Sequence, residues 1–189
     1  MKYLLLNGSI VGKKTRTMLD TFNVYLENQV LDNDLIELID LRNKQINFSD
    51  GRNWQDNQGD TLEVLQKIMA ADVIILGVPT YQASIPAPLK NIFDLLPEGA
   101  FYQKTVGFLV SAGTAKHFLV MEFQLKPILS FMKANTLSNY VFAQDSDFNG
   151  SKIDSDAIRM RLASYAEDVK VISETYRNQI KKQENSYGF

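Results

Sequence analysis

Short runs of apolar residues alternate along the chain with segments in which apolar residues recur every three or four positions. The unbroken runs are typical of strands that are covered on both faces, and the longer spacing is typical of helices. Strands are predicted over residues 2–6, 35–39, 73–78, 106–110 and 137–142. Helices are predicted over residues 18–26, 61–70, 88–96, 117–133 and 158–180.

The regular alternation of strand and helix predicts a parallel sheet with helices on both faces. We expect a three-layer α/β/α fold with a five-stranded parallel sheet in the order 2-1-3-4-5, in which residues 73–78 (VIILGV) form a central strand. No repeat or linker divides the chain, so residues 1–189 are expected to form a single domain. The polar segment 40–59 is too long for an ordinary connection, and we expect it to be functional or disordered.

Composition and charge narrow the function classes. The chain has 20 Lys and Arg residues against 22 Asp and Glu residues, which predicts no strong attraction to nucleic acid or to an anionic membrane. The absence of cysteine and the single His117 argue against a metal site, and redox chemistry therefore needs a bound cofactor. The first apolar run is too short for a signal peptide and none is long enough to span a membrane, so we expect a cytoplasmic protein.

Three loops follow predicted strands at the edge of the sheet where a ligand is expected. The first, residues 8–17 (GSIVGKKTRT), brings hydroxyls and backbone N–H groups to a helix amino end, as in phosphate sites, but lacks the Walker A and GxGxxG patterns. The second, residues 79–86 (PTYQASIP), offers hydroxyls, an amide and an aromatic face, and the third, residues 111–114 (SAGT), is small enough to approach a ligand. Taken singly, the first loop also fits a polar helix cap, and the second a proline-bounded turn with Tyr81 on the core.

The three loops together resemble those of a known family. In order along the chain, GSIVGKKTRT, GVPTYQASIPAPLKNIFDLLP and SAGTAKHFLVMEFQLKPIL resemble the NAD(P)H-dependent FMN reductases of the flavodoxin-like fold, over residues 3–148. The chain looks closest to the FMN reductase component of two-component alkanesulfonate monooxygenase systems, because FDLLP, GTxxH and LKPIL follow in the order of that subfamily. The resemblance implies FMN and NAD(P)H as ligands, a homodimer or homotetramer, and a monooxygenase partner.

The resemblance also implies the roles of individual residues. The FMN phosphate would be held by Ser9, Thr15, Arg16 and Thr17. The isoalloxazine ring would be edged by Pro79, Thr80, Tyr81 and Gln82, with Ser111, Ala112 and Gly113 on its pyrimidine side. No side chain is expected to be catalytic, because the flavin accepts hydride at N5 from the nicotinamide, and His117 is expected to be a structural or capping group. Ile10 and Val11 stand where the relatives commonly have an arginine, and Arg16 and Lys13 are the candidates to replace it.

The helix predicted over residues 117–133 contains Pro127, which has no N–H to donate to the carbonyl of Phe123. The freed carbonyl favours a kink or a π-bulge. In the resembling reductases a tyrosine at a subunit interface typically takes the place of Phe123. Residues 89–96 and 118–131 hold more apolar residues than one buried face requires, so we expect these two helices to pair subunits.

Other functions fit parts of the pattern. The alternatives are an FMN-bound quinone or azo reductase and a flavodoxin-like electron-transfer protein, although flavodoxins are usually more acidic than this chain. The spacing of acidic residues from Asp145 to Asp156 matches part of an EF-hand calcium loop. Lys152 at an apolar position of that motif, and a strand in place of the preceding helix, instead favour a solvated loop that caps the last helix.

Overall fold

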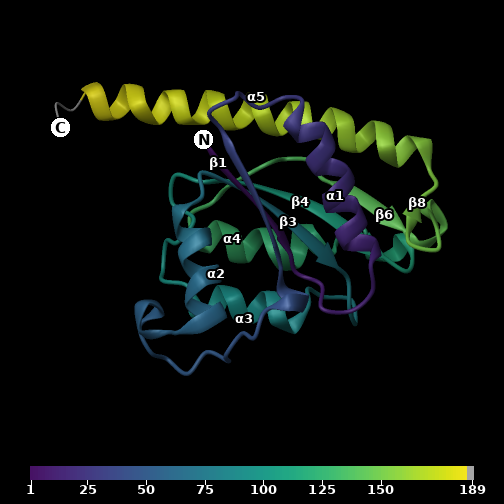
Figure 1. Cartoon of the computed structure of the whole chain (residues 1–189), viewed down its shortest axis with the longest axis horizontal. Coiled ribbons are helices and arrows are strands. Elements are labelled where there is room, and N and C mark those ends of the chain that lie inside the picture. Colours follow the sequence, from purple (N-terminus) through teal and green to yellow (C-terminus); the bar gives the residue numbers. More distant parts are fainter. Residues whose placement is uncertain (187–189) are drawn as a thin grey trace.

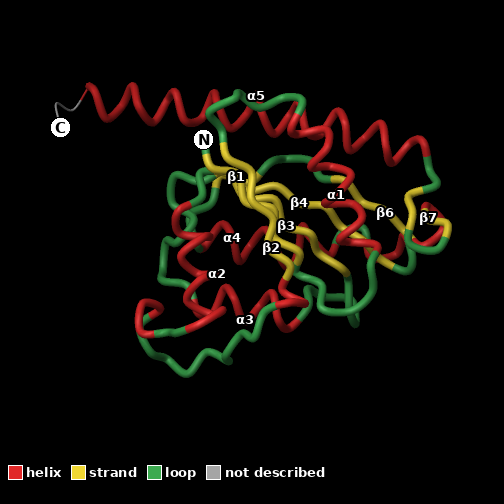
Figure 2. Tube along the Cα trace, in the orientation of Figure 1, coloured by secondary structure: helices red, strands yellow, loops and turns green. Residues whose placement is uncertain are grey.

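A parallel β-sheet forms the middle layer of the computed structural model, which describes residues 1–186 (Figure 1, Figure 2). Its strands are β1 (Lys2–Asn7), β2 (Leu35–Asp40), β3 (Val73–Pro79), β4 (Thr105–Ala112), β5 (Asn135–Thr136) and β6 (Val141–Gln144). They lie in the order β2-β1-β3-β4-β5, and β6 also pairs with β4. All of these pairs are parallel, so the predicted order 2-1-3-4-5 is confirmed.

Helices cover both faces of the sheet (Figure 1). The helices α1 (Lys14–Glu27) and α5 (Asp156–Ser186) lie on one face, and α2 (Gly59–Ala70), α3 (Ala87–Leu95) and α4 (Lys126–Phe131) lie on the other. Successive strand side chains point to opposite faces, so Leu4 and Leu6 enter one apolar core while Tyr3 and Leu5 enter the other. Every residue of β3 and β4 is buried, as expected for the central strands of a covered sheet.

The fifth position in the sheet is divided between two short strands. The pattern predicts one strand over residues 137–142, but the ladder with β4 stops after Thr136 and resumes at Val141. Between these points the carbonyl of Ser138 accepts a hydrogen bond from the Lys126 side chain, and Asn139 donates to a carboxylate of α5. Because side chains from two helices bind this segment, it leaves the ladder, and the prediction of one continuous strand is wrong.

The fourth helix begins later than its pattern predicts. Ala115–His117 form a 3₁₀ turn that is capped by the hydroxyl of Thr114, and the continuous helix starts only at Val120. The hydroxyl of Tyr140 donates to the carbonyl of Phe118 at 2.5 Å and so removes an acceptor that a helix would use. The helix start predicted at residue 117 is therefore wrong.

Residues Met121–Leu125 form a single π-helical turn, called here the π-turn, and α4 continues the helix to Phe131. Pro127 lies two residues after the π-turn and has no N–H for the carbonyl of Phe123. The wider spacing of the π-turn accommodates this missing donor, and the π-bulge predicted from Pro127 is confirmed. Phe123 lies on the outer side of the turn with 74% of its surface exposed.

The long connection between β2 and α2 is ordered. It contains two 3₁₀ turns, Leu41–Asn43 and Trp54–Asp56, and packs along α2 and α3. The N–H of Ser49 donates to Oδ1 of Asn91 at 3.0 Å, which fastens the segment to α3. The alternative of disorder is therefore wrong for this segment.

Side chains at the amino end of α2 also form hydrogen bonds with this connection. Thr61 Oγ1 accepts the N–H of Asn47 at 3.0 Å, and Asp60 accepts the N–H of Gln45 at 2.8 Å. Neither residue caps its own helix, whose N-cap is Gln58. Both side chains are therefore bound to the neighbouring segment rather than to the first turn of α2.

Residues after β6 form a small hairpin beside the sheet. A 3₁₀ turn, Asp145–Asp147, leads into β7 (Phe148–Asn149) and β8 (Lys152–Ile153). Among residues 1–186, no group of three or more His, Asp or Glu side chains is arranged to hold a metal ion. Within the same range, no helix has the length and apolar character that crossing a membrane requires.

Candidate functional site

The carboxyl ends of β1, β3, β4 and β6 meet at one edge of the sheet because these strands are parallel. The loops that leave them enclose an open cavity of about 370 Å³, called here the strand-end cavity. It is lined by Val11, Gly12, Lys13, Lys14, Thr15, Pro79, Thr80, Tyr81, Ser111, Ala112, Gly113, Asp145 and Ser151. The three loops singled out in the sequence therefore converge on one cavity, and the hairpin after β6 adds a wall.

The amino end of α1 forms a positively charged wall of the cavity. The N-cap residue is Lys13, no side chain caps the helix, and the first turn contains no acidic residue. The first backbone N–H groups therefore have no helical partner, and the positive end of the helix dipole lies beside Lys13 and Lys14. Such an uncapped end is suited to an anionic group such as a phosphate.

Lys14 connects this wall to the hairpin on the other side. Its Nζ lies 2.7 Å from Oδ1 of Asp145 and 5.4 Å from the centroid of the Phe148 ring. Both charged side chains are partly exposed, so their ion pair contributes little to the free energy of unfolding. Lys14 and Asp145 are far apart along the chain, and no sequence motif predicts that they pair. In the sequence, Asp145 stands out only as the first of the acidic residues spaced between Asp145 and Asp156.

Two buried hydroxyls join α1 to the end of β4. Thr15 Oγ1 lies 2.6 Å from Oγ of Ser111, and both residues are almost fully buried. This hydrogen bond fixes the backbone at Ser111, and the wall continues through Ala112 to Gly113. A Cβ added to Gly113 would meet no atom within 4 Å, so the space beside this residue is open.

Thr80 supplies the test of whether a polar ligand fits the cavity. Its Oγ1 is buried and has no hydrogen-bond partner among the described residues. Its backbone N–H donates to the carbonyl of Ser111 at 2.8 Å, which fixes Thr80 at the cavity wall. An unpartnered buried hydroxyl is rare in folded proteins, and a ligand with a polar edge would satisfy it. The donor set thus fits a flat ligand with polar edges and a phosphate, as FMN has.

Tyr81 bridges the second loop and the first. Its hydroxyl donates to the carbonyl of Val11 at 3.0 Å and lies 3.1 Å from Oγ of Ser9. Ser9 is buried behind this contact and does not line the cavity itself. Gln82 follows Tyr81 at the exposed tip of a turn and lies outside the cavity wall as well.

Arg16 and Thr17 also lie outside the cavity wall. The guanidinium of Arg16 is paired with Asp20 at 2.7 Å and with Asp40 at 3.1 Å. Burial acts to lower the pKa of Arg16, but the hydrogen bonds with the two carboxylates outweigh it and raise the pKa. Asp40 also accepts from Asn7 at 2.8 Å, so Arg16 is part of the network that shapes the first loop.

Seven of the eleven predicted site residues therefore line the strand-end cavity: Thr15, Pro79, Thr80, Tyr81, Ser111, Ala112 and Gly113. The other four lie behind or beside it: Ser9, Arg16, Thr17 and Gln82. His117 is half-buried in its 3₁₀ turn and does not line the cavity. The three predicted loops meet at this cavity, but which side chains of each loop face inward depends on contacts with other loops.

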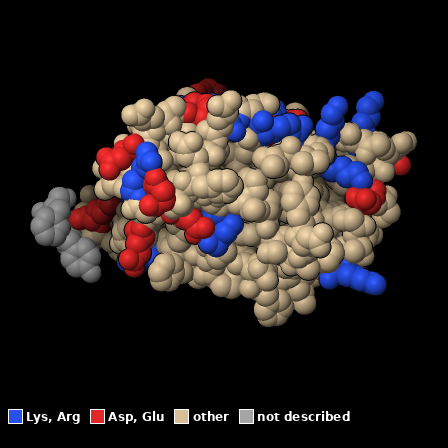
Figure 3. Space-filling model, turned by 90° about the horizontal axis from the view of Figure 1, so that it is seen from below, with Lys and Arg blue, Asp and Glu red and all other residues tan. Residues whose placement is uncertain are grey.

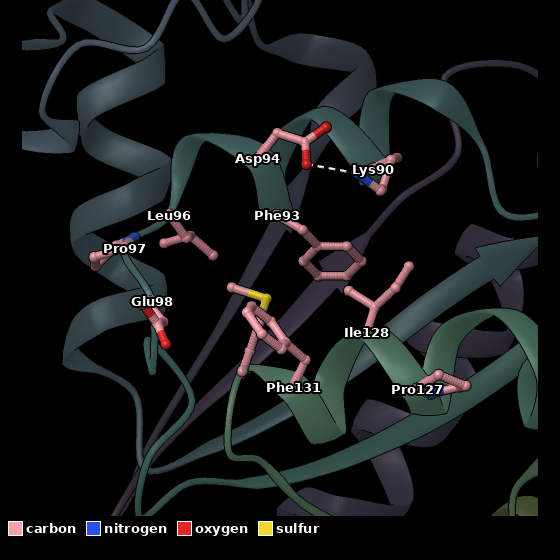
Figure 4. Close-up of a pocket in the computed structure, with 10 residues that line it drawn as sticks. Lys90, Phe93, Asp94, Leu96, Pro97, Glu98, Pro127, Ile128 and Phe131 are labelled. Atoms are coloured by element: carbon pink, nitrogen blue, oxygen red, sulfur yellow. Dashed lines mark hydrogen bonds and ion pairs between the residues drawn. The ribbon is translucent and has the colours of Figure 1, made fainter.

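A second hollow, of about 600 Å³, lies between α3 and α4 and is called here the α3–α4 groove (Figure 4). Phe93 of α3 points across it toward Ile128 and Phe131 of α4. The ion pair between Lys90 and Asp94 lies at its edge at 2.5 Å. On the side of α3, Figure 3 shows a broad area without charged side chains at the centre of the view and toward its right, with charged groups to its left and along the upper rim.

The sequence of this chain matches that of a known protein family. The family model described as NADPH-dependent FMN reductase matches residues 1–149. The chain belongs to this family. An NAD(P)H-dependent FAD/FMN reductase of Geobacillus thermodenitrificans is 36% identical over 170 residues, which cover 89% of this chain and 91% of the relative. An FMN reductase (NADPH) of Pseudomonas aeruginosa is 36% identical over 104 residues, 55% of this chain and 56% of the relative.

The fold of this reductase is similar to that of solved structures. The apo form of an NADH:FMN oxidoreductase, EmoB, superposes with a TM-score of 0.74 at 19% identity, over 90% of this chain and 88% of that one. The strand order 2-1-3-4-5 is that of the flavodoxin-like fold. The predicted fold and family are thus confirmed, and reduction of flavin with NAD(P)H is the activity that this family carries out.

Proposed function

We propose that this reductase transfers hydride from NAD(P)H to FMN, and that FMN binds in the strand-end cavity. The chemistry of the cavity carries the proposal, because an uncapped helix end with two lysines lies at one wall and the unpartnered hydroxyl of Thr80 at another. The first suits a phosphate and the second suits the polar edge of a ring. In this proposal residues 1–189 act as one FMN-binding domain.

The FMN phosphate is proposed to lie at the amino end of α1. Lys13, Lys14 and the free N–H groups of the first turn line this part of the cavity and bind the phosphate directly. The residues that the resemblance assigns to the phosphate complete and support this site: Ser9, Thr15, Arg16 and Thr17. Arg16 acts through Asp40, since its guanidinium is already paired there.

The isoalloxazine ring is proposed to lie between the loops that follow β3 and β4. The residues around it are Pro79, Thr80, Tyr81, Gln82, Ser111, Ala112 and Gly113. Thr80 donates its hydroxyl to the ring edge, Tyr81 limits access of water, and the open space at Gly113 admits the ring. When bound, FMN supplies the hydride acceptor for the nicotinamide, so the protein binds and orients the two rings and no side chain needs to transfer a proton in this step.

Titration of the purified protein with FMN, followed by visible absorbance and by oxidation of NADH and NADPH, tests the proposal. We expect saturable binding and steady oxidation of NAD(P)H that depends on FMN. Replacing Lys13 and Lys14 by Gln should weaken FMN binding by about 1–3 kcal/mol, the range for hydrogen bonds to charged groups. The matched control replaces Lys181 and Lys182, at the exposed end of α5, and should leave binding unchanged. No FMN-dependent oxidation by the wild type would overturn the proposal.

The same assay distinguishes between the candidate acceptors of the electrons from reduced FMN. We propose a monooxygenase in the cytoplasm as the partner that consumes reduced FMN, and in that case NAD(P)H oxidation rises with added free FMN. A quinone or azo reductase with resident FMN would need its acceptor and no added flavin. A flavodoxin-like electron carrier would oxidise no NAD(P)H by itself.

We further propose that two or more copies associate through the α3–α4 groove and the exposed side of the π-turn and α4. Apolar residues recur there at every fourth position, and Leu119, Phe123 and Phe131 have 51%, 74% and 71% of their surfaces exposed. Exposed aromatic residues beside an apolar groove are typical of protein interfaces. A second copy would cover them, giving the homodimer or homotetramer that the resemblance implies.

A further inference from the structure

The turn that follows β3 has an unfavourable backbone conformation. Gln82 and Ala83 have φ angles of 48° and 57°, in the left-handed region that favours glycine. The N–H of Tyr81 donates to the carbonyl of Ser84 at 3.0 Å, and the N–H of Ser84 donates back at 2.9 Å. This reciprocal pair closes a two-residue turn of the type that normally contains Asn-Gly. Because neither central residue is glycine, contacts outside the turn must hold it in place.

Two side chains of the turn make such contacts in opposite directions. On one side, the hydroxyl of Tyr81 donates to the carbonyl of Val11 and so fastens the turn to the first loop of the cavity. On the other side, Oγ of Ser84 donates to Oε1 of Gln124 at 3.0 Å, 40 residues further along the chain. Gln124 belongs to the π-turn. The strained turn is therefore held between the strand-end cavity and the π-turn.

We infer that Gln124 is a positioning residue of the flavin site. Gln124 accepts a hydrogen bond from the Ser84 hydroxyl and so holds the turn in the position in which Thr80 and Tyr81 line the cavity. Gln124 does not line the cavity itself, so it acts only through Ser84. The inference rests on the proposed function, because FMN is the ligand whose binding the turn adjusts.

The place of Gln124 in the π-turn gives the contact a further consequence. Met121 and Leu125, at the two ends of the π-turn, are fully buried, whereas Phe123 and Gln124 lie on its outer side. Phe123 is part of the surface proposed to meet a second copy, and the next residue along the chain holds the flavin turn. In the proposed assembly, a contact at Phe123 would therefore lie one residue from the side chain that holds the flavin turn.

A double-mutant cycle tests the inference. Gln124→Leu removes the acceptor and Ser84→Ala removes the donor, and each should weaken FMN binding about fivefold, the effect of losing one ordinary hydrogen bond. Each should also change the visible circular dichroism of bound FMN, which reports the position of the ring. The double variant should bind FMN no more weakly than either single variant, because both act on one contact. Asn139→Ala is the matched control, since it removes an exposed amide hydrogen bond of 3.1 Å to Asp168.

Losses that multiply in the double variant, or single variants that bind FMN as the wild type does, would overturn the inference. Light scattering of each variant ensures that a change in assembly is not mistaken for a change in the turn. Amide hydrogen exchange over residues 79–86, measured without FMN, gives a readout that is independent of the ligand. Faster exchange in both single variants supports the inference, and unchanged exchange would overturn it. A wild type that does not bind FMN would overturn the proposed function, while the exchange result would still decide whether Gln124 holds the turn.

Discussion

The strand-end cavity and the α3–α4 groove differ in what forms them. The cavity, of about 370 Å³, is built by loops at the ends of parallel strands, which bring lysines, hydroxyls and backbone N–H groups together. The groove, of about 600 Å³, is built by side chains of two helices and is mainly apolar. The larger hollow is therefore not the one equipped to bind a polar cofactor. Convergent hydrogen-bond donors, rather than volume, distinguish the candidate active site.

Unfavourable features are also distributed unequally between the two regions. The cavity has the unpartnered hydroxyl of Thr80, the uncapped end of α1, and the strained residues Gln82 and Ala83 beside it. At the groove Lys90 is paired with Asp94, and the left-handed residue nearby, Lys133, directly follows the C-cap of α4, where this conformation is common. Strain and unsatisfied groups are typical of sites that bind a ligand, whereas an exposed apolar groove is typical of sites that bind a protein surface.

The largest expected effect is at the groove. Phe131→Asp places a carboxylate in the proposed subunit contact, and desolvating it costs several kcal/mol, enough to dissociate the oligomer. Light scattering over a range of concentrations measures this, and FMN affinity should change little. Phe48→Asp is the control, because Phe48 is 83% exposed on the segment after β2, outside the groove. A monomeric wild type, or an intact oligomer in Phe131→Asp, would contradict the proposed assembly.

Phe123→Asp sharpens the comparison because Phe123 is followed by Gln124, whose side chain contacts the turn beside the cavity. We expect it to break assembly by the same desolvation cost and also to weaken flavin binding through Gln124. Phe131→Asp and Phe123→Asp should therefore agree in light scattering and differ in FMN titration. Equal FMN affinity in the two variants would argue that the groove and the cavity are independent.

The next effect is confined to the cavity. Gly113→Val adds a side chain where no atom lies within 4 Å, so the melting temperature should stay the same, while the filled space should weaken FMN binding by about 2 kcal/mol or more. Gly77→Ala is the contrasting variant, because its Cβ would lie 2.5 Å from Cδ1 of Leu19. It should lower the free energy of unfolding by about 1–3 kcal/mol. Unchanged FMN affinity in Gly113→Val would place the flavin elsewhere.

A smaller effect is expected from Thr80→Val. Removal of an unpartnered buried hydroxyl should leave the free energy of unfolding unchanged or raise it by about 1 kcal/mol, whereas FMN binding should weaken by about 1 kcal/mol. Thermal unfolding without FMN and titration with FMN measure the two changes. Thr80→Ser keeps the hydroxyl and should retain FMN affinity. A loss of stability in Thr80→Val without FMN would show that the hydroxyl already has a partner.

The smallest expected effect is at the ion pair across the cavity. Asp145→Asn frees Lys14 and removes a negative charge near the proposed phosphate, so FMN binding should strengthen, by less than about 1 kcal/mol because the pair is partly exposed. The gain should shrink as the salt concentration rises. Asp154→Asn, in the same hairpin segment, is the control, because Asp154 forms no ion pair within residues 1–186. Weaker FMN binding in Asp145→Asn would place the phosphate away from Lys14.

Local chemistry explains where sequence-based prediction succeeded. The unbroken apolar run of β3 and the helical spacing in α5 determine element type through the burial they require, and the alternation of elements then determines the strand order. The π-turn was predictable from Pro127 because the missing N–H is a property of one residue. The split between β5 and β6 was not, because it depends on side chains of α4 and α5 that bind the segment from outside.

Periodicity and the rules of parallel sheets were enough to predict most elements of this reductase, the strand order and the three loops that meet at the strand ends. They did not predict the divided fifth strand or the late start of the fourth helix. Which side chains of those loops face the cavity depends instead on contacts between elements. Thr15 is bound to Ser111, Arg16 to Asp40, and Lys14 to Asp145. Each of these contacts joins residues that are distant along the chain, and the packing of the helices on the sheet brings these residues together.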